Sequence, residues 1–120
     1  MKTFEDLPIY QKAKELSVQI YRIDNAKYRK DFGFKDQIQR AAVSVMNNIA
    51  EGFERGSDRD FIRFLYYSKG SAGEIRSLLN LALELKYIEK DFYEVVKNDC
   101  IEISKQLSNF IKYLYNKLEK

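Results

Sequence analysis

The sequence contains no histidine and no tryptophan, and only one cysteine, one proline and five glycines among its 120 residues. Histidine is the most common acid–base catalyst and the most common metal ligand, so its absence argues against many hydrolases and metal centres. Di-metal helical bundles in particular use Glu-x-x-His motifs. Scarce glycine and proline argue against sandwiches and barrels, whose turns use both residues. The sequence therefore favours a helical protein without a metal site.

Features of secreted, membrane-spanning and nucleotide-binding proteins are also missing. The single cysteine, Cys100, has no partner for an intrachain disulfide, and no apolar run reaches the roughly eighteen residues of a membrane-spanning helix. No signal sequence is recognisable, and the glycines match neither of the common nucleotide-binding spacings. Without histidine, neither Cys100 nor any serine has an obvious activating base. We therefore expect a cytoplasmic protein that is not an enzyme, has no cofactor and does not associate with membranes.

Apolar residues recur at alternating steps of four and three along most of the chain, the spacing of helices with one buried side. This periodicity predicts four helices, which run from Asp6–Pro8 to about Ile23, from Phe34 or Lys35 to about Glu54, from Ser57 to about Lys86, and from Glu89–Asp91 to the C-terminus. Asp6 and Ser57 are expected to cap the first and third helices. The segment from Asp24 to Gly33 lacks the periodicity and is predicted to be a loop.

The helix pattern predicts both the domain organisation and the fold class. A hydrophobic content of 45% over 120 residues suits a single domain, residues 1–120, with one core. Four amphipathic helices with mostly short connections predict an all-α fold, an antiparallel up-down-up-down four-helix bundle. Cys100 lies on the apolar side of the last helix and is expected to be a small buried residue.

The segment from Lys69 to Gly73 contains two glycines and could interrupt the third helix. However, Leu65, Ala72 and Leu79 keep one heptad register through it, which a loop would normally shift. We therefore expect a continuous helix whose small residues, from Ser68 to Gly73, allow a neighbouring helix to approach closely.

Two groups of basic residues are candidates for binding nucleic acid, although the net charge is only +3. Arg55, Arg59 and Arg63 are spaced four apart, with Tyr66, Tyr67 and Lys69 nearby. Such a row could follow a phosphate backbone while tyrosines stack on unpaired bases. The second group lies in the first predicted loop and consists of Lys27, Arg29, Lys30 and Lys35. The alternative interpretation is a solvated surface, paired with carboxylates such as Asp58 and Asp60 at about 0.3–0.5 kcal/mol per pair.

Apolar residues outside the predicted core, and two adjacent asparagines in the second helix, suggest a surface that contacts another copy of the chain. Asparagine is a poor helix former, and buried amides can set the register of helical assemblies. The residues expected at this oligomer interface are Asn47, Asn48, Phe64, Tyr67, Ser71, Leu78 and Tyr115.

Several segments together resemble a known family. They are Phe4-Glu5-Asp6-Leu7, Gln11-Lys12-Ala13, Gln37 to Val45, Asn48-Ile49-Ala50-Glu51-Gly52, Phe61 to Leu65, Gly70-Ser71 and Glu74. This pattern resembles the small bacterial four-helix-bundle proteins encoded by intervening sequences in 23S ribosomal RNA genes, sometimes labelled S23 ribosomal proteins. The sequence has Met46 where the family commonly has proline, and Lys86 where it commonly has glycine.

The resemblance implies an antiparallel bundle that forms ring-like homopentamers and has no enzymatic activity. It also implies kinship with the accessory proteins of diversity-generating retroelements, which are basic pentamers that associate with nucleic acid and a reverse transcriptase. The expected partners are therefore further copies of this chain, RNA or DNA, and a polymerase-like protein. A scaffold that docks such a protein through Tyr66, Tyr67 and Tyr115 is the alternative to nucleic-acid binding.

Overall fold

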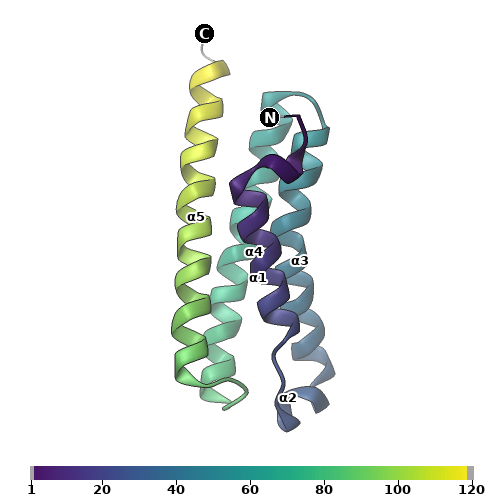
Figure 1. Cartoon of the computed structure of the whole chain (residues 1–120), viewed down its shortest axis with the longest axis vertical. Coiled ribbons are helices and arrows are strands. Elements are labelled where there is room, and N and C mark those ends of the chain that lie inside the picture. The colour runs from purple at the N-terminus through teal and green to yellow at the C-terminus, as the bar shows by residue number, and fades with distance from the viewer. Residues whose placement is uncertain (1, 119–120) are drawn as a thin grey trace.

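The computed structural model describes residues 2–118, and helices are the only regular secondary structure in that range (Figure 1). A short 3₁₀ helix, η1 (Phe4–Asp6), precedes α1 (Pro8–Tyr21), α2 (Ala26–Lys30), α3 (Phe32–Glu54), α4 (Asp58–Glu84) and α5 (Lys90–Leu118). No strand occurs between residues 2 and 118. The predicted all-α class is confirmed, with four long helices and a shorter one.

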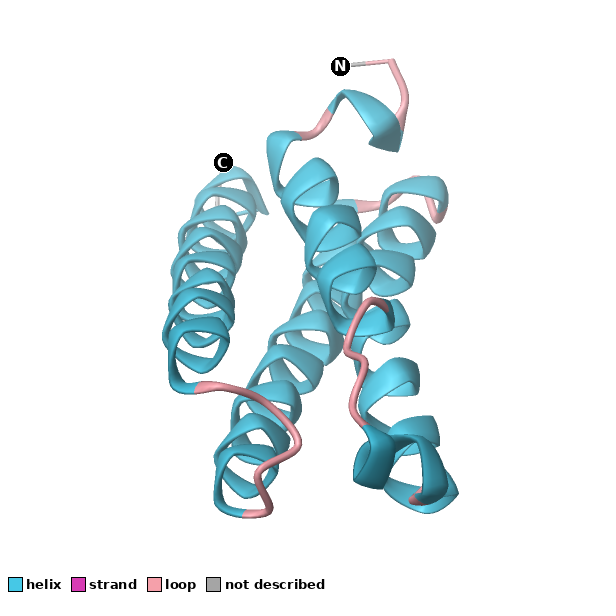
Figure 2. Cartoon of the chain, turned by 60° about the horizontal axis from the view of Figure 1, so that its bottom comes forward, coloured by secondary structure: helices cyan, strands magenta, loops and turns pink. Residues whose placement is uncertain are grey.

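The helices form an elongated molecule of 52 × 21 × 20 Å. Helix α3 packs against α1 and α4, α4 packs against α5, and α5 also contacts α1. In Figure 1, α1 and α4 run toward the end that carries α2, whereas α3 and α5 run away from it. The loops that connect the helices are short (Figure 2). As a result, the α3–α4 connection and the C-terminal end of α5 lie at one end of the molecule, with α2 at the other.

The core consists of the residues that the periodicity places on the apolar sides of the four long helices. Sixteen apolar residues of these helices are at most 1% exposed: Ala13, Leu16, Ile20, Ile38, Ala42, Val45, Ile49, Leu65, Ala72, Ile75, Leu79, Ala82, Val96, Cys100, Ile103 and Leu107. Burial of large aliphatic side chains stabilises a fold by about 1.5–3 kcal/mol each. Cys100 is buried as predicted, and this burial raises the pKa of its thiol to about 12.

The predicted loop between Asp24 and Gly33 is wrong in part, because five of its residues form α2 and its last two begin α3. The side chain of Asn25 accepts hydrogen bonds from the backbone N–H groups of Lys27 and Tyr28, at 2.9 and 3.0 Å. Asp31 accepts one from the N–H of Phe34, at 3.2 Å. Each side chain caps the helix that follows it. The segment is too short to show apolar periodicity, so its capping residues were the only available signal.

The predicted cap of the first helix is also wrong. Asp6 accepts hydrogen bonds from the backbone N–H groups of Lys2 and Thr3, at 3.2 and 3.1 Å, and so stabilises η1. Helix α1 instead begins with Pro8 in its first turn, where a missing N–H group carries no cost. The predicted cap of the third helix is confirmed, because Ser57 Oγ accepts from the N–H of Asp60 at 3.1 Å.

Helix α4 is continuous through Lys69–Gly73, as predicted, but the two glycines are not the site of close helix approach. A Cβ atom added to Gly70 or Gly73 would meet nothing within 4 Å. The close contact with α3 is made by Ser68, whose hydroxyl donates to the carbonyl oxygen of Val45 at 2.7 Å. Gly52 on α3 provides the remaining space, since an added Cβ would lie 2.8 Å from Phe64 Cβ.

Helix α4 ends near the predicted position, and Lys86 follows in a left-handed conformation with φ of 62°. The backbone N–H of Tyr87 donates to the carbonyl oxygen of Ala82 at 2.9 Å, and that of Lys86 donates to Leu83 at 3.1 Å. This geometry usually has glycine at the left-handed position. Lys86 thus adopts the backbone conformation that glycine, the more common residue here in the family that the sequence resembles, would favour.

Candidate nucleic-acid interface

Arg55, Arg59 and Arg63 lie at the corner where α3 passes into α4. Arg55 follows the last residue of α3, Gly56 turns the chain with φ of +83°, and the other two arginines occupy the first two turns of α4. All three side chains are exposed. The predicted stripe is therefore a surface feature at one end of the molecule.

The ring of Phe64 orients two of these arginines. The guanidinium carbon atoms of Arg55 and Arg63 lie 4.8 and 5.1 Å from its centroid. Cation–π contacts at exposed sites contribute about 0.5–1 kcal/mol each. The side chain of Tyr67 packs edge-on against the same ring, with 5.6 Å between centroids. The two guanidinium groups are thus held around one aromatic side chain, which reduces the rotamer freedom they would lose on binding an anion.

The alternative interpretation, a solvated and paired surface, is confirmed in part. Arg55 pairs with Glu51 at 3.2 Å and Arg63 with Asp60 at 3.3 Å, each within its own helical segment. Both pairs are about half exposed and contribute little, between about 0 and 1 kcal/mol. Asp58 pairs with Lys117 of α5 at 3.3 Å instead of with an arginine. Between residues 2 and 118, Arg59 has no ion pair.

The structure does not bring the predicted basic residues into one surface. Lys27, Arg29 and Lys30 are exposed on α2, at the opposite end from the arginine corner (Figure 1). Arg29 also pairs with Asp24. Lys69 lies on α4 beside α5, in a groove that contains none of the three arginines. The predicted nucleic-acid-binding residues therefore occupy three separate places on one chain.

The predicted interface residues differ in how much surface they offer to a partner. Asn47, Tyr67 and Tyr115 are exposed. The side chains of Phe64 and Leu78 are only 7% and 9% exposed, because their own chain already covers them. Asn47 lies in a shallow hollow on the outer side of α1 and α3, together with Tyr21, Arg40 and Glu51.

Asn48 and Ser71 take part in a small polar cluster between α3 and α4. The side-chain N–H₂ group of Asn48 donates to the carbonyl oxygen and to the hydroxyl of Ser44, at 2.8 and 2.9 Å. The hydroxyl of Ser71 donates to Ser44 Oγ at 2.8 Å. These groups therefore have partners within the subunit, and Asn47 is the amide of the pair that faces outward.

Two basic residues that lie beside Lys69 were not predicted from the sequence as candidate binding residues. Arg76 lies two turns further along α4, and Lys105 approaches the same groove from α5. The seven-residue spacing of Lys69 and Arg76 was a visible signal, because it places both on one side of a helix. Nothing in the sequence indicated which side of α5 would lie opposite them.

The structure offers no sign of a metal site or membrane segment in the part of the chain that it describes. Across residues 2–118, no three Cys, Asp or Glu side chains come together in a way that could hold a metal ion. None of the helices in that range is long and apolar enough to cross a membrane.

Comparison with known proteins found a matching family model and matching solved structures. A family model described as 23S rRNA-intervening sequence protein matches residues 5–109. The matching solved structures include a protein of unknown function from the S23 ribosomal protein family of Bacteroides thetaiotaomicron. It is 32% identical, with 87% of this chain and 98% of that chain covered and a TM-score of 0.79. A search of curated proteins gave no match.

Proposed function

Because this chain belongs to the family of 23S rRNA-intervening sequence proteins, we propose that it is a non-enzymatic helical bundle that binds RNA or another nucleic acid through basic surfaces. The observation that carries the proposal is the arginine corner. Arg55 and Arg63 are oriented around Phe64, and Arg59 stands exposed between them without an ion pair among residues 2–118. Guanidinium groups are suited to phosphate oxygens, and Tyr66 and Tyr67 are exposed nearby for stacking on unpaired bases.

The proposal includes assembly into a cytoplasmic homo-oligomer, in the first place a pentamer. One subunit carries a net charge of only +3, whereas five would carry +15. Such a ring would attract a polyanion much more strongly, and its repeated arginine corners could contact one strand several times. The subunit in this assembly is the antiparallel up-down-up-down bundle, which the alternating directions of the long helices in Figure 1 support.

Charge reversal at the corner tests the proposal. Arg59→Glu combined with Arg63→Glu should weaken binding to labelled single-stranded RNA, measured by fluorescence anisotropy at several salt concentrations. The slope of log K against log salt is negative, and each lost phosphate contact makes it shallower by about 0.7, so the loss of two contacts makes it shallower by about 1.4. Lys12→Glu with Lys14→Glu changes the charge equally on the exposed side of α1 and should have a much smaller effect. A wild-type protein that binds neither structured nor single-stranded RNA at low salt would contradict the proposal.

The second candidate function is a scaffold that docks a polymerase-like protein. It is favoured by Tyr66, Tyr67 and Tyr115, three large aromatic side chains that are each about half exposed. Aromatic residues are enriched in protein–protein interfaces. A pull-down after nuclease treatment distinguishes the two functions, because a docked protein would stay bound and a nucleic-acid-bridged one would be lost. Substituting Tyr66 and Tyr67 by serine should abolish the capture of a directly docked protein.

A further inference from the structure

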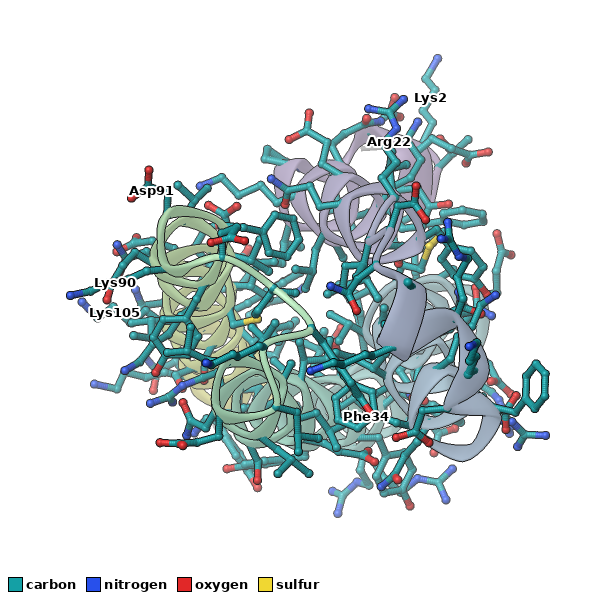
Figure 3. The ribbon with its side chains drawn as sticks, turned by 90° about the horizontal axis from the view of Figure 1, so that it is seen from below. Lys2, Arg22, Phe34, Lys90, Asp91 and Lys105 are labelled. Atoms are coloured by element: carbon teal, nitrogen blue, oxygen red, sulfur yellow. The ribbon has the colours of Figure 1, made fainter. Side chains whose placement is uncertain are left out.

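A shallow groove with a volume of about 450 Å³ lies between α4 and α5, and all its charged lining residues are basic. Its polar lining consists of Lys69 and Arg76 from α4, and Ser104, Lys105, Ser108 and Asn109 from α5. No carboxylate lines it. Figure 3 shows Lys105 projecting from α5 away from the interior, toward solvent. The groove therefore joins three cationic side chains with hydroxyl and amide groups that can donate hydrogen bonds.

The acidic residues of this part of α5 face a different neighbour. Asp99 and Glu102 line the groove between α5 and α1, together with residues such as Lys12 and Arg22. The side of α5 that faces α4 carries Ser104, Lys105 and Ser108 instead. Of these two acidic residues only Glu102 reaches a cation of the α4–α5 groove, at 3.9 Å from Lys105, so the positive charge of that groove is only weakly offset.

Arg76 has an unsatisfied hydrogen-bond donor in this groove. Its Nε atom is buried and has no hydrogen-bond partner, and the side chain forms no ion pair with any residue between 2 and 118. Buried donors are nearly always paired, because a donor removed from water without a new partner keeps its full desolvation cost. Among residues 2–118, the only ion pair of Lys105 is a loose one, with 3.9 Å between Nζ and Glu102 Oε1. The charges of Arg76 and Lys105 are therefore hardly compensated by carboxylates in the described part of the chain.

A hydrogen-bonded network holds a fourth cation close to the Arg76 end of the groove. The hydroxyl of Tyr93 donates to Asn80 Oδ1 at 2.6 Å and accepts from Lys97 Nζ at 3.1 Å. Asn80 lies one turn after Arg76 on α4, and Lys97 lies one turn before Ile101, which also lines the groove. The ammonium group of Lys97 is therefore fixed in place and adds positive charge along the same side of the molecule.

The length of the groove favours an extended ligand with repeated negative charges. Lys69 and Arg76 are seven residues apart on one helix, which corresponds to about 10 Å along its axis. A stacked nucleic-acid strand carries one phosphate per about 3.4 Å, so this length matches about three nucleotides. Tyr66, which is about half exposed, lies about one turn before Lys69 on α4, and an exposed aromatic ring there can offer a stacking surface to a base.

We propose that the α4–α5 groove binds the sugar–phosphate backbone of a single nucleic-acid strand, with Lys69, Arg76 and Lys105 contacting phosphate oxygens. The inference rests on the proposed nucleic-acid-binding function and adds to it a second, more enclosed site. Ser104, Ser108 and Asn109 donate hydrogen bonds to the same backbone. The arginine corner then captures the strand at one end of the molecule, and the groove holds it along α4.

The test uses a fluorescein-labelled single-stranded oligouridine and the full-length protein. Lys69→Gln with Lys105→Gln should make the negative slope of log K against log salt shallower by about 1.4, since two phosphate contacts are lost. The matched control, Lys12→Gln with Lys14→Gln, removes the same charge from α1 and should leave the slope unchanged. Arg76→Lys keeps the charge but removes the Nε donor, and should weaken binding several-fold without changing the slope. Circular dichroism verifies that each variant remains helical.

The outcomes separate this inference from the proposed function. Suppose that the wild-type protein binds the oligouridine and that Arg59→Glu with Arg63→Glu weakens this binding. If Lys69→Gln with Lys105→Gln then binds as tightly as wild type, the proposed groove site is overturned, whereas the proposed nucleic-acid-binding function stands. An equal loss of affinity in the groove variant and in the control variant would also overturn the proposed groove site, because the change in net charge would then explain the effect. If the wild-type protein binds duplex RNA but no oligouridine, the proposal of a single-strand site in the groove is overturned, but the proposed function is not. If it binds neither, the proposed function fails as well.

Discussion

At the residue scale, Gly52 and Phe64 determine how closely the two long central helices approach. A Cβ atom at Gly52 would lie 2.8 Å from Phe64 Cβ and 2.9 Å from Phe61 Cδ1, which is closer than real contacts allow. The absence of a side chain at Gly52 lets Phe64 lie against α3, with the guanidinium carbons of Arg55 and Arg63 4.8 and 5.1 Å from its ring centroid. One glycine in the core thus supports the orientation of two arginines on the surface.

This contact predicts opposite effects of alanine at two helical glycines. Gly52→Ala should destabilise the protein by about 1–3 kcal/mol, because α3 and α4 must move apart. Gly70→Ala should stabilise it by about 0.5–1 kcal/mol, because the site is open and alanine favours the helix. Urea unfolding followed by circular dichroism measures both values. A Gly52→Ala variant as stable as wild type would show that the helices tolerate a wider separation.

At the element scale, an aromatic cluster joins α2 and the start of α3 to the connection between α4 and α5. The rings of Tyr28, Phe34 and Tyr87 pack edge to face, with centroids 5.3 to 6.2 Å apart. Phe34 lies inside the molecule at this end (Figure 3). The hydroxyl of Tyr87 donates to Asp31 Oδ2 at 2.7 Å. The residue that caps α3 is therefore also bonded to a distant part of the chain.

This bond predicts a pH-dependent contribution to stability. The hydrogen bond from Tyr87, together with that from the N–H of Phe34, lowers the pKa of Asp31 below its ordinary value. The ionised carboxylate therefore stabilises the fold above the unfolded-state pKa of about 3.9, and this contribution is lost as the pH falls through the lower folded-state value. Tyr87→Phe should lower the melting temperature at neutral pH, and the difference from wild type should shrink in acid. A difference that stays constant down to pH 2 would contradict this role.

At the scale of the whole molecule, the elongated subunit places its basic residues at separate positions. The arginine corner and α2 lie at opposite ends of a molecule 52 Å long, and the α4–α5 groove lies between them along one side. A single subunit with a net charge of +3 is a weak attractor for a polyanion. The proposed function therefore depends on whether several subunits combine their basic surfaces.

The proposed assembly predicts a molar mass well above the 14.2 kDa of one chain. Light scattering at micromolar concentration should give about five times that value if the ring forms. Tyr115→Glu should reduce it by placing a charge in the predicted interface. Val95→Glu is the matched control, because Val95 is an exposed residue of the same helix outside the predicted interface. A wild-type monomer would contradict the ring, and an equal effect of both variants would remove Tyr115 from the interface.

The sequence by itself determined the helices and the sides on which they are buried. Apolar spacing is a local property, so Leu65, Ala72 and Leu79 predicted both the continuity of α4 and its buried side. The capping role of Ser57 was equally local. The short α2 was missed because five residues carry no periodicity, although Asn25 and Asp31 are good capping residues.

Only the tertiary structure decided which residues from different helices meet. Helix periodicity shows which side of α5 is buried, but it does not show which part of that helix lies beside Lys69 and Arg76. Helix periodicity likewise does not distinguish Gly52 from Gly70. A Cβ atom added at Gly52 would lie 2.8 Å from Phe64 Cβ, whereas one added at Gly70 would meet nothing within 4 Å. Both depend on the relative rotation and separation of packed helices, which are set by side-chain interdigitation across the whole core.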